Sequence, residues 1–277
     1  MTARWKSELD GPTCVAEGGQ DVQASGLTCE RLVVRFGGVV AVDSVSIMVP
    51  RAQIVGLVGP NGSGKTTVVN AISGFVGAQG GSVTVGGHHV TGRRPDQIAR
   101  LGVSRTFQAG RVFENLTVEE NLTIGKVRMG TTGELLASVR HRPSVKARQA
   151  VRDQAMEVAR VFGDRLLSKW QLPAGTLSYA NRRRVEVARA FMGKPRAVLL
   201  DEPTAGMNPR ETEELAAQVA SSLRTRAACV LIIEHKTSFI SSVCDYVYVL
   251  DFGRCIAEGP PQQVWARPEV RRAYLGT

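Results

Sequence analysis

The sequence predicts an α/β protein built on a mostly parallel β-sheet. Glycine is abundant, at 29 of 277 residues, aromatic residues make up only 5%, and strand-like runs alternate with helix-like stretches. The run at residues 54–58 is short and continuously apolar, as is typical of a parallel strand buried on both faces. With 43% apolar residues, a chain of this length can bury one large domain, or a core that carries a smaller inserted lobe.

The periodicity and the cap signals place the elements along the chain. We expect strands at residues 31–36, 42–49, 54–58, 82–85, 197–200, 230–233 and 246–250, and helices starting near Lys65, at Thr117 and at Pro209, with a charged, alanine-rich helix over 145–162. Thr117 and Glu120 form a capping box, and Asn208 caps the helix that Pro209 opens. The strand at 42–49 alternates, which predicts one buried face.

The order of these elements predicts three parts of the chain. Residues 108–193 look like a helical lobe inserted into a sheet domain made of residues 27–107 and 194–277. Residues 1–26 mix acidic side chains with Gly and Ser and lack the apolar core of a signal peptide, so we expect a poorly ordered, cytoplasmic extension. No apolar run approaches the roughly 18 to 20 residues that a bilayer span needs, so we expect no membrane crossing.

Charge and cysteine usage exclude several functional classes. The net charge of +10 would suit nucleic acid or an anionic membrane, but the basic residues are dispersed and no aromatic residues are interleaved with them, so no nucleic acid partner is expected. The cysteines are odd in number and form no CxxC pair, which suggests neither a zinc site nor a disulfide framework; they lie at positions 14, 29, 229, 244 and 255.

A phosphate-binding loop follows the buried strand at 54–58. The sequence from Gly59 to Thr66 fits GxxxxGK[ST] and lies between a predicted strand and a predicted helix, which is the context the motif requires; its residues are Gly59, Pro60, Asn61, Gly62, Ser63, Gly64, Lys65 and Thr66. Glycines let successive N–H groups point inward around a polyphosphate. Lys65 would reach the β and γ phosphates, and the Thr66 hydroxyl would ligate Mg²⁺. The alternative is an ordinary glycine-rich turn.

Two carboxylates end the apolar strand at 197–200. Asp201 and Glu202 would meet the phosphate loop at the carboxyl edge of the sheet. Asp201 would hold Mg²⁺ through water, and Glu202 would polarise the attacking water. Without the loop, such a pair would equally fit a structural or solvated role.

Further motifs resemble those of ABC transporter ATPases. Residues 177–181 (LSYAN) look like the signature motif LSGGQ; Phe107-Gln108 resembles the Q-loop, residues 205–208 the D-loop, and Glu234-His235 the switch histidine. The similarity spans residues 27–277 with the motifs in the expected order. It implies the ABC ATPase fold: a P-loop NTPase core with a mostly parallel sheet, an antiparallel β subdomain and an inserted helical subdomain.

The resemblance assigns roles to single residues. Phe36 would stack on adenine, Gln108 would contact Mg²⁺ or the water, and His235 would bind the γ-phosphate; Thr67 joins the phosphate contacts. Alone, these would be explained as a core Phe, a surface Gln and a structural His. Ser178 and Ala180 would contact ATP held by a partner subunit in a head-to-tail dimer. The resemblance also implies a role for Asn208 across the dimer interface, but a helix cap explains this residue equally well.

The closest pattern is that of importers for branched-chain amino acids and related amides or urea. The similar stretches are RFGGVVAVDSVS, RTFQAGRVFENLTVEENL, RRRVEVARAF, LLDEPTAGMNPRETEEL and PEVRRAYLG. The resemblance implies an ATPase subunit that uses ATP and Mg²⁺, pairs with a second ATP-binding subunit and permease subunits, and sits peripherally on the cytoplasmic face of the inner membrane. The alternatives are a lipopolysaccharide-export-like ATPase, a non-transport ABC ATPase acting on nucleic acid or ribosomes, and a binding-only regulatory subunit.

The chain departs from the family pattern at three positions. Ala180 and Asn181 replace Gly and Gln of the signature, and Lys236 stands where an acid is common. If Ala180 lies in a first helical turn with negative φ, as we expect, alanine is tolerated; a positive φ would strain it. Lys236 would bring a positive charge near the nucleotide.

Overall fold

The computed structural model describes residues 26–107, 112–127, 145–226 and 228–275. Nearly all of the predicted N-terminal extension, Cys14, and the predicted Q-loop residue Gln108 lie outside these ranges. Within them, no helix is long and apolar enough to span a bilayer.

A six-stranded sheet forms the centre of the molecule. Its order is β10-β9-β3-β8-β7-β6, and all neighbouring pairs are parallel except β9 with β10. The strands are β3 (Ile54–Val58), β6 (Val103–Arg105), β7 (Ala197–Asp201), β8 (Cys229–Ile233), β9 (Tyr246–Asp251) and β10 (Arg254–Gly259). The predicted mostly parallel sheet is confirmed.

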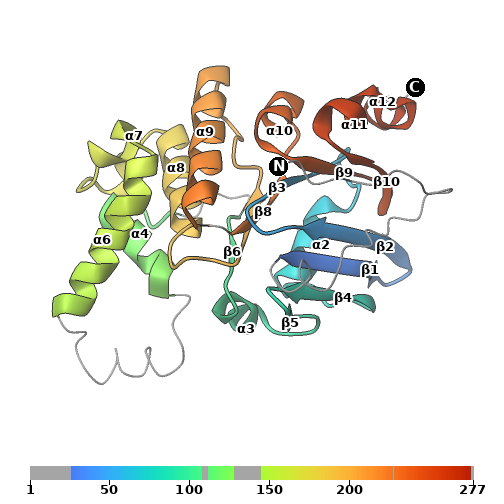
Figure 1. Ribbon diagram of the computed structural model, residues 1–277, viewed down its shortest axis with the longest axis horizontal. Coiled ribbons are helices and arrows are strands. Elements are labelled where there is room, and N and C mark those ends of the chain that lie inside the picture. The colour runs from blue at the N-terminus through green and yellow to red at the C-terminus, as the bar shows by residue number, and fades with distance from the viewer. Residues whose placement is uncertain (1–25, 108–111, 128–144, 227, 276–277) are drawn as a thin grey trace, which may run out of the picture.

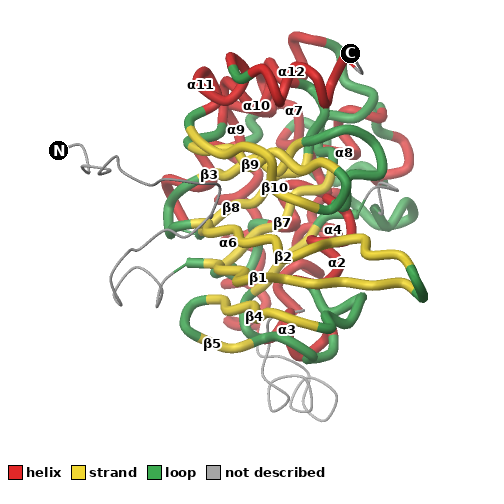
Figure 2. The backbone as a smooth tube through the Cα atoms, turned by 90° about the vertical axis from the view of Figure 1, so that its right-hand side faces the viewer, coloured by secondary structure: helices red, strands yellow, loops and turns green. Residues whose placement is uncertain are grey.

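A second, antiparallel sheet packs beside the first one (Figure 2). Its order is β2-β1-β4-β5, and its strands are β1 (Leu27–Phe36), β2 (Val39–Val49), β4 (Gly80–Val85) and β5 (His88–His89). The β1–β2 hairpin turns at Gly37. Its φ is +57°, a positive value that tight hairpin turns need and that glycine adopts without strain. This sheet is the antiparallel β subdomain that the family resemblance implies.

Helices cover the sheets and form a separate lobe. Around the sheets lie α2 (Lys65–Ile72), α3 (Pro95–Arg100), α9 (Pro209–Arg226), α10 (Thr237–Val243), α11 (Pro261–Ala266) and α12 (Pro268–Leu275). Between β6 and β7 the chain forms α4 (Val118–Val127), α6 (Val145–Val161), α7 (Asp164–Leu167), a 3-10 turn (Ala174–Thr176) and α8 (Tyr179–Ala190). These four helices gather at the left of Figure 1, away from the antiparallel sheet. We keep residues 108–193 as the proposed extent of this helical lobe.

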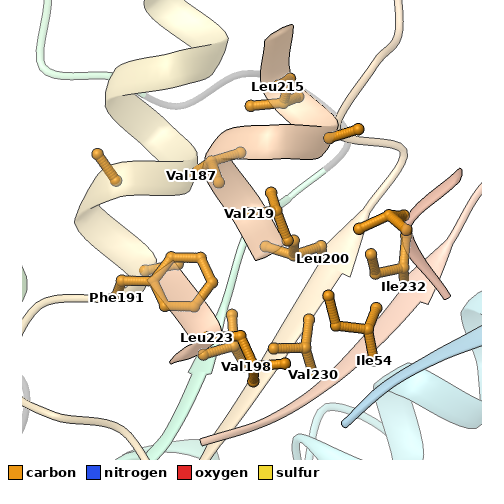
Figure 3. Packing of buried hydrophobic residues seen from close by; sticks show 14 of the residues in the cluster. Ile54, Val187, Phe191, Val198, Leu200, Leu215, Val219, Leu223, Val230 and Ile232 are labelled. Carbon is orange, nitrogen blue, oxygen red and sulfur yellow. The ribbon is translucent and has the colours of Figure 1, made fainter. Parts of the chain in front are cut away.

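Residues of the central strands alternate between two cores. On β7, Val198 and Leu200 pack with the helices of the lobe and with α9, whereas Leu199 packs in the core that the antiparallel sheet and α2 share. Figure 3 shows the first core, where Val187 of α8 and Phe191, directly after this helix, meet the side chains of α9 and the sheet. Both faces of the central sheet are therefore buried, which explains why its strands are continuously apolar.

The four described cysteines are free thiols. Cys29, Cys229 and Cys244 are buried and unbridged, and Cys255 is half-buried and unbridged. Burial raises the pKa of Cys29 and Cys229 to about 12, so these thiols stay protonated near neutral pH.

Candidate functional site

Three loops meet at one edge of the central sheet. Strand β8 lies between β3 and β7, and all three run parallel, so the segments after them emerge on the same side. The phosphate loop follows β3, Asp201 ends β7 with Glu202 directly after it, and His235 comes after β8. The topology thus brings the predicted loop, carboxylates and histidine together.

The phosphate loop needs its glycines for steric reasons. Gly59 has φ +147°, and a β-carbon there would lie 2.1 Å from the Leu250 carbonyl oxygen. Gly64 has φ +101°, and its β-carbon would lie 2.6 Å from the Ala41 carbonyl oxygen. Gly64 caps α2 without any side chain, so the first N–H groups of the helix are left to a ligand. This geometry is suited to binding an anion.

Lys65 lies at the centre of this arrangement. Its ammonium is buried and donates to the carbonyl oxygens of Gly59 at 2.9 Å and Pro60 at 2.7 Å. Burial lowers the pKa of Lys65, while the charges of Glu202 and Asp201 act in the opposite direction. Both carboxylates are therefore within electrostatic reach of the loop lysine.

Asp201 is a buried carboxylate with one oxygen engaged. Its Oδ2 pairs with Arg105 at 3.1 Å, whereas its buried Oδ1 has no hydrogen-bond partner among the described residues. Burial raises the pKa of Asp201, and the Arg105 contact opposes this shift. An acceptor left open in this way fits a metal-bound water.

Arg105 is a site residue that sequence reasoning did not single out. From β6 it reaches Asn70 at 2.7 Å, Ser73 at 2.8 Å and Asp201, while its guanidinium lies 5.0 Å from the ring centre of Phe107. It therefore ties the end of β7 to α2. The one sequence signal near Arg105 is the stretch RTFQ at residues 105–108, where the resemblance to the Q-loop concerns Phe107 and Gln108.

Glu202 and His235 form a hydrogen-bonded pair. His235 Nε2 lies 3.1 Å from Glu202 Oε1, and both side chains are partly exposed. An ionised carboxylate only accepts, so Nε2 carries the hydrogen when Glu202 is charged. Glu202 has φ +47°, a left-handed conformation that costs a non-glycine residue roughly 1 to 3 kcal/mol. This turn aims the carboxylate out of the strand toward His235.

Comparison with known proteins identifies the family. Residues 42–205 match the ABC transporter family model. The chain belongs to the ABC transporter ATP-binding cassettes. Residues 254–277 also match the branched-chain amino acid ATP-binding cassette transporter model. The fold class and the expected ATP-hydrolysing transporter subunit are confirmed.

Curated relatives and solved structures agree with this assignment. The cassette is 38% identical over 252 residues to the high-affinity branched-chain amino acid transport ATP-binding protein LivG of Salmonella typhimurium, covering 90% of the cassette and 97% of LivG. It is 39% identical over 257 residues to BraF of Pseudomonas aeruginosa, which has the same description, covering 92% and 97%. A crystal structure of an ABC transporter cassette in its ADP conformation superposes with a TM-score of 0.78, at 32% identity, covering 91% and 99%.

The signature segment of the cassette begins helix α8. Ser178 is exposed and caps this helix, because its hydroxyl accepts from the Asn181 N–H at 3.4 Å. Ala180 lies in the first turn without a positive φ, so the expected helical conformation is confirmed. The methyl of Ala180 packs into the lobe core. The side-chain oxygen Oδ1 of the buried Asn181 accepts a hydrogen bond from the Arg184 guanidinium at 3.1 Å. Both departures are thus accommodated inside the cassette.

A buried ion pair joins the lobe to the site. Arg183 and Glu186 of α8 pair at 2.7 Å, and each is 2% exposed. Glu186 accepts from the Phe107 N–H at 3.1 Å, while Arg183 donates to the Phe107 carbonyl at 3.1 Å and to the Glu202 carbonyl at 3.4 Å. No local sequence pattern indicates these contacts, because those to Phe107 join residues more than 70 positions apart.

The remaining described residues that the sequence predicted lie at the end of β1 and in the first turn of α2. Phe36 is 52% exposed at the tip of the β1–β2 hairpin, which contradicts its reading as a core residue. Thr66 and Thr67 lie half-buried in the first turn of α2.

A cavity of about 620 Å³ opens beside the phosphate loop. It is lined by Pro60, Asn61, Gly62, Ser63, Asp251, Phe252, Ile256, Glu269, Arg272 and Ala273. The capping boxes at Thr117 and Asn208 are confirmed.

Proposed function

We propose that this cassette binds and hydrolyses ATP to drive uptake of branched-chain amino acids, or a related small polar solute, through a separate permease. The hydrolytic part rests on one observation: Lys65, Asp201 and the Glu202–His235 pair meet at one sheet edge beside a glycine-lined anion site. The substrate class rests on the similarity to LivG and BraF. It follows that the cassette would act peripherally, on the cytoplasmic face of the inner membrane.

In this proposal the loop residues bind the triphosphate. The backbone N–H groups of residues 61–66, which run into the start of α2, surround the β and γ phosphates, Lys65 supplies a positive charge, and Thr67 adds a hydroxyl. Phe36, exposed at the hairpin tip, offers an aromatic face to the adenine. Strand β2 reaches the loop at Ala41, next to Gly64, which supports a position of this hairpin beside the nucleotide.

The site residues fit Mg²⁺ that arrives with ATP. Among the described residues no cluster of three or more His, Cys, Asp or Glu side chains could hold a metal, so phosphate oxygens would supply much of the coordination. Thr66 would ligate the ion directly, Asp201 through water at its open Oδ1, and Gln108 is the further proposed contact. The ion would neutralise phosphate charge as the terminal bond breaks.

Glu202 and His235 are proposed as the catalytic residues for water attack. The Glu202 carboxylate accepts a proton from the water as the water oxygen attacks the γ-phosphorus. The His235 N–H holds the carboxylate at 3.1 Å and would bind a γ-phosphate oxygen once ATP is present. In a head-to-tail dimer with a second ATP-binding subunit, Ser178 and the backbone of Ala180 would contact the ATP of the partner subunit.

The catalytic assignment is tested by Glu202→Gln in the assembled transporter. We expect hydrolysis to fall by at least about a hundredfold, because the amide cannot accept the proton of the water. ATP binding, measured by calorimetry with Mg²⁺, should stay within about threefold of the unmodified cassette. Glu213→Gln, on an exposed face of α9, serves as the control that leaves turnover unchanged. Unchanged turnover in Glu202→Gln would refute the assignment.

A further inference from the structure

The two residues that flank His235 both bind the segment that follows Glu202. We call residues 203–208, between β7 and α9, the strand-end loop, and residues 234–236, between β8 and α10, the histidine loop. The sequence suggested a positive charge beside the nucleotide at Lys236. The structure shows that this side chain is engaged by the strand-end loop.

The Lys236 ammonium has three acceptors, as many as it has N–H donors. It donates to the carbonyl oxygens of Thr204 at 3.1 Å and Met207 at 2.8 Å, and to the Thr212 hydroxyl at 3.3 Å. These contacts bracket the strand-end loop and reach the first turn of α9. A charged donor strengthens each of these hydrogen bonds relative to a neutral one.

Glu234 fastens the same two loops from the other side of His235. Its carboxylate is 3% exposed and accepts from the Thr204 N–H at 2.8 Å and from the Thr204 hydroxyl. It also accepts from the N–H groups of His235 at 2.8 Å and Lys236 at 3.3 Å. His235 is therefore fixed on both sides to the residues directly after Glu202.

The strand-end loop also touches the signature segment. Gly206 has φ +70°, and a β-carbon there would lie 2.7 Å from the Tyr179 ring, so the ring rests on the loop backbone. Tyr179 directly follows Ser178, and its ring lies 5.9 Å from the Arg183 guanidinium. The strand-end loop is thus held between Tyr179 and Lys236.

We propose that Lys236 is a positioning residue for ATP hydrolysis. By holding the strand-end loop at Thr204 and Met207, it keeps His235 in hydrogen-bond contact with Glu202. This inference rests on the proposed catalytic role of that pair. It predicts that Lys236 affects the chemical step and not nucleotide binding, because its ammonium touches neither the phosphate loop nor Lys65 among the contacts that the structure shows.

The test compares Lys236→Met, which keeps the stem and removes the charge, with Lys236→Arg and the exposed control Lys146→Met. In the full transporter, Lys236→Met should lower kcat at least about fivefold with KM for ATP within about twofold, and Lys236→Arg should restore most of the loss. Lys146→Met should match the unmodified cassette. Should Lys236→Met not fold, Lys236→Gln is measured by the same criteria.

A double-mutant cycle shows whether Lys236 acts through the histidine. In a His235→Ala background, Lys236→Met should reduce the residual rate by less than about twofold. An equal loss with and without His235, or a kcat of Lys236→Met within about twofold of the unmodified cassette, would overturn the inference.

Amide hydrogen exchange keeps the two proposals distinguishable. Lys236→Met should speed exchange in residues 204–208 and 234–236, while residues 54–58 stay protected as in Lys146→Met. This readout does not need turnover. An unmodified cassette that fails to hydrolyse ATP refutes the proposed function, whereas unchanged exchange in both loops refutes the role of Lys236.

Discussion

Ala180 illustrates how one side chain can depart from a family motif and keep its backbone. The residue has a helical backbone in the first turn of α8, and its methyl is 5% exposed within the lobe core. The N–H groups at the start of α8 keep their direction, since Ser178 still caps the helix. The segment that would contact the ATP of a partner subunit is therefore intact.

Ala180→Gly should not improve the cassette. Glycine in this turn removes buried methyl contacts and costs the helix about 1 kcal/mol in propensity. We expect a lower midpoint of chemical unfolding and a turnover, in the assembled transporter, within about threefold of the unmodified protein. A rise in turnover above about tenfold would show that the natural signature is impaired.

At the scale of elements, neighbouring side chains of β7 pack into two different hydrophobic cores. Leu199 and Leu200 are both fully buried, but they point to opposite faces of the central sheet. Leu199 contributes to the core under the antiparallel sheet, and Leu200 to the core under α8 and α9. A single five-residue strand thereby joins the two halves of the molecule.

Leu199→Ala and Leu200→Ala should each destabilise the cassette by about 3 kcal/mol, because each leaves a cavity in a packed core. Denaturant unfolding followed by circular dichroism measures this loss. The control is Val145→Ala on α6, where the side chain is 83% exposed, and it should change stability by less than about 0.5 kcal/mol. A loss below about 1 kcal/mol at either leucine would contradict the assignment of that face.

The sequence predicted the elements that carry a strong local signal. The strand at residues 54–58 is continuously apolar, and the helix starts at Thr117 and Asn208 have both halves of a capping box, so each was predicted correctly. Strand β6 has only three residues, two of them polar, and β10 (RCIAEG) has no regular alternation of apolar and polar residues, so neither was predicted. Their pairing partners, far along the chain, decide their conformation.

The candidate site shows the same difference between local and long-range signals. Lys65 follows β3 and Asp201 ends β7 at motif spacing, and the charge of Asp201 opposes the lowering of the Lys65 pKa by burial, as expected for a carboxylate near the loop. Arg105, Glu186 and Lys236 contact residues 24 or more positions away, and no local pattern reveals such contacts. The assigned chemical roles themselves stay predictions.

At the scale of the whole molecule, the phosphate loop lies where separate parts of the chain meet. Gly64 approaches Ala41 of β2, and the Gly253 N–H in the β9–β10 turn donates to the Ser63 carbonyl at 3.1 Å. The antiparallel sheet and the far edge of the central sheet thus both support the loop. A ligand that binds there should stabilise the fold as a whole.

MgATP should therefore raise the thermal midpoint of Glu202→Gln, which cannot turn it over. A concentration about one hundred times the Kd adds about 2.7 kcal/mol to the stability of the folded state, which corresponds to several degrees. Differential scanning fluorimetry measures the shift. Adding Lys65→Ala to this variant should remove most of the shift, whereas adding Lys146→Ala should keep it. An equal shift in both would mean that the ligand binds elsewhere.

Arg183 connects the helical lobe to the candidate site through hydrogen bonds to two backbone carbonyl groups. One guanidinium, sealed from water, holds the main chain at Phe107 and at Glu202, and both are outside the helix that carries it. If α8 tilts, these two backbone positions must follow, or Arg183 loses its hydrogen bonds to their carbonyl groups, each worth about 1.5 to 3 kcal/mol, while Glu186 moves with the helix. A tilt of this one helix would therefore shift the backbone of Glu202, the residue proposed to take the proton of the attacking water.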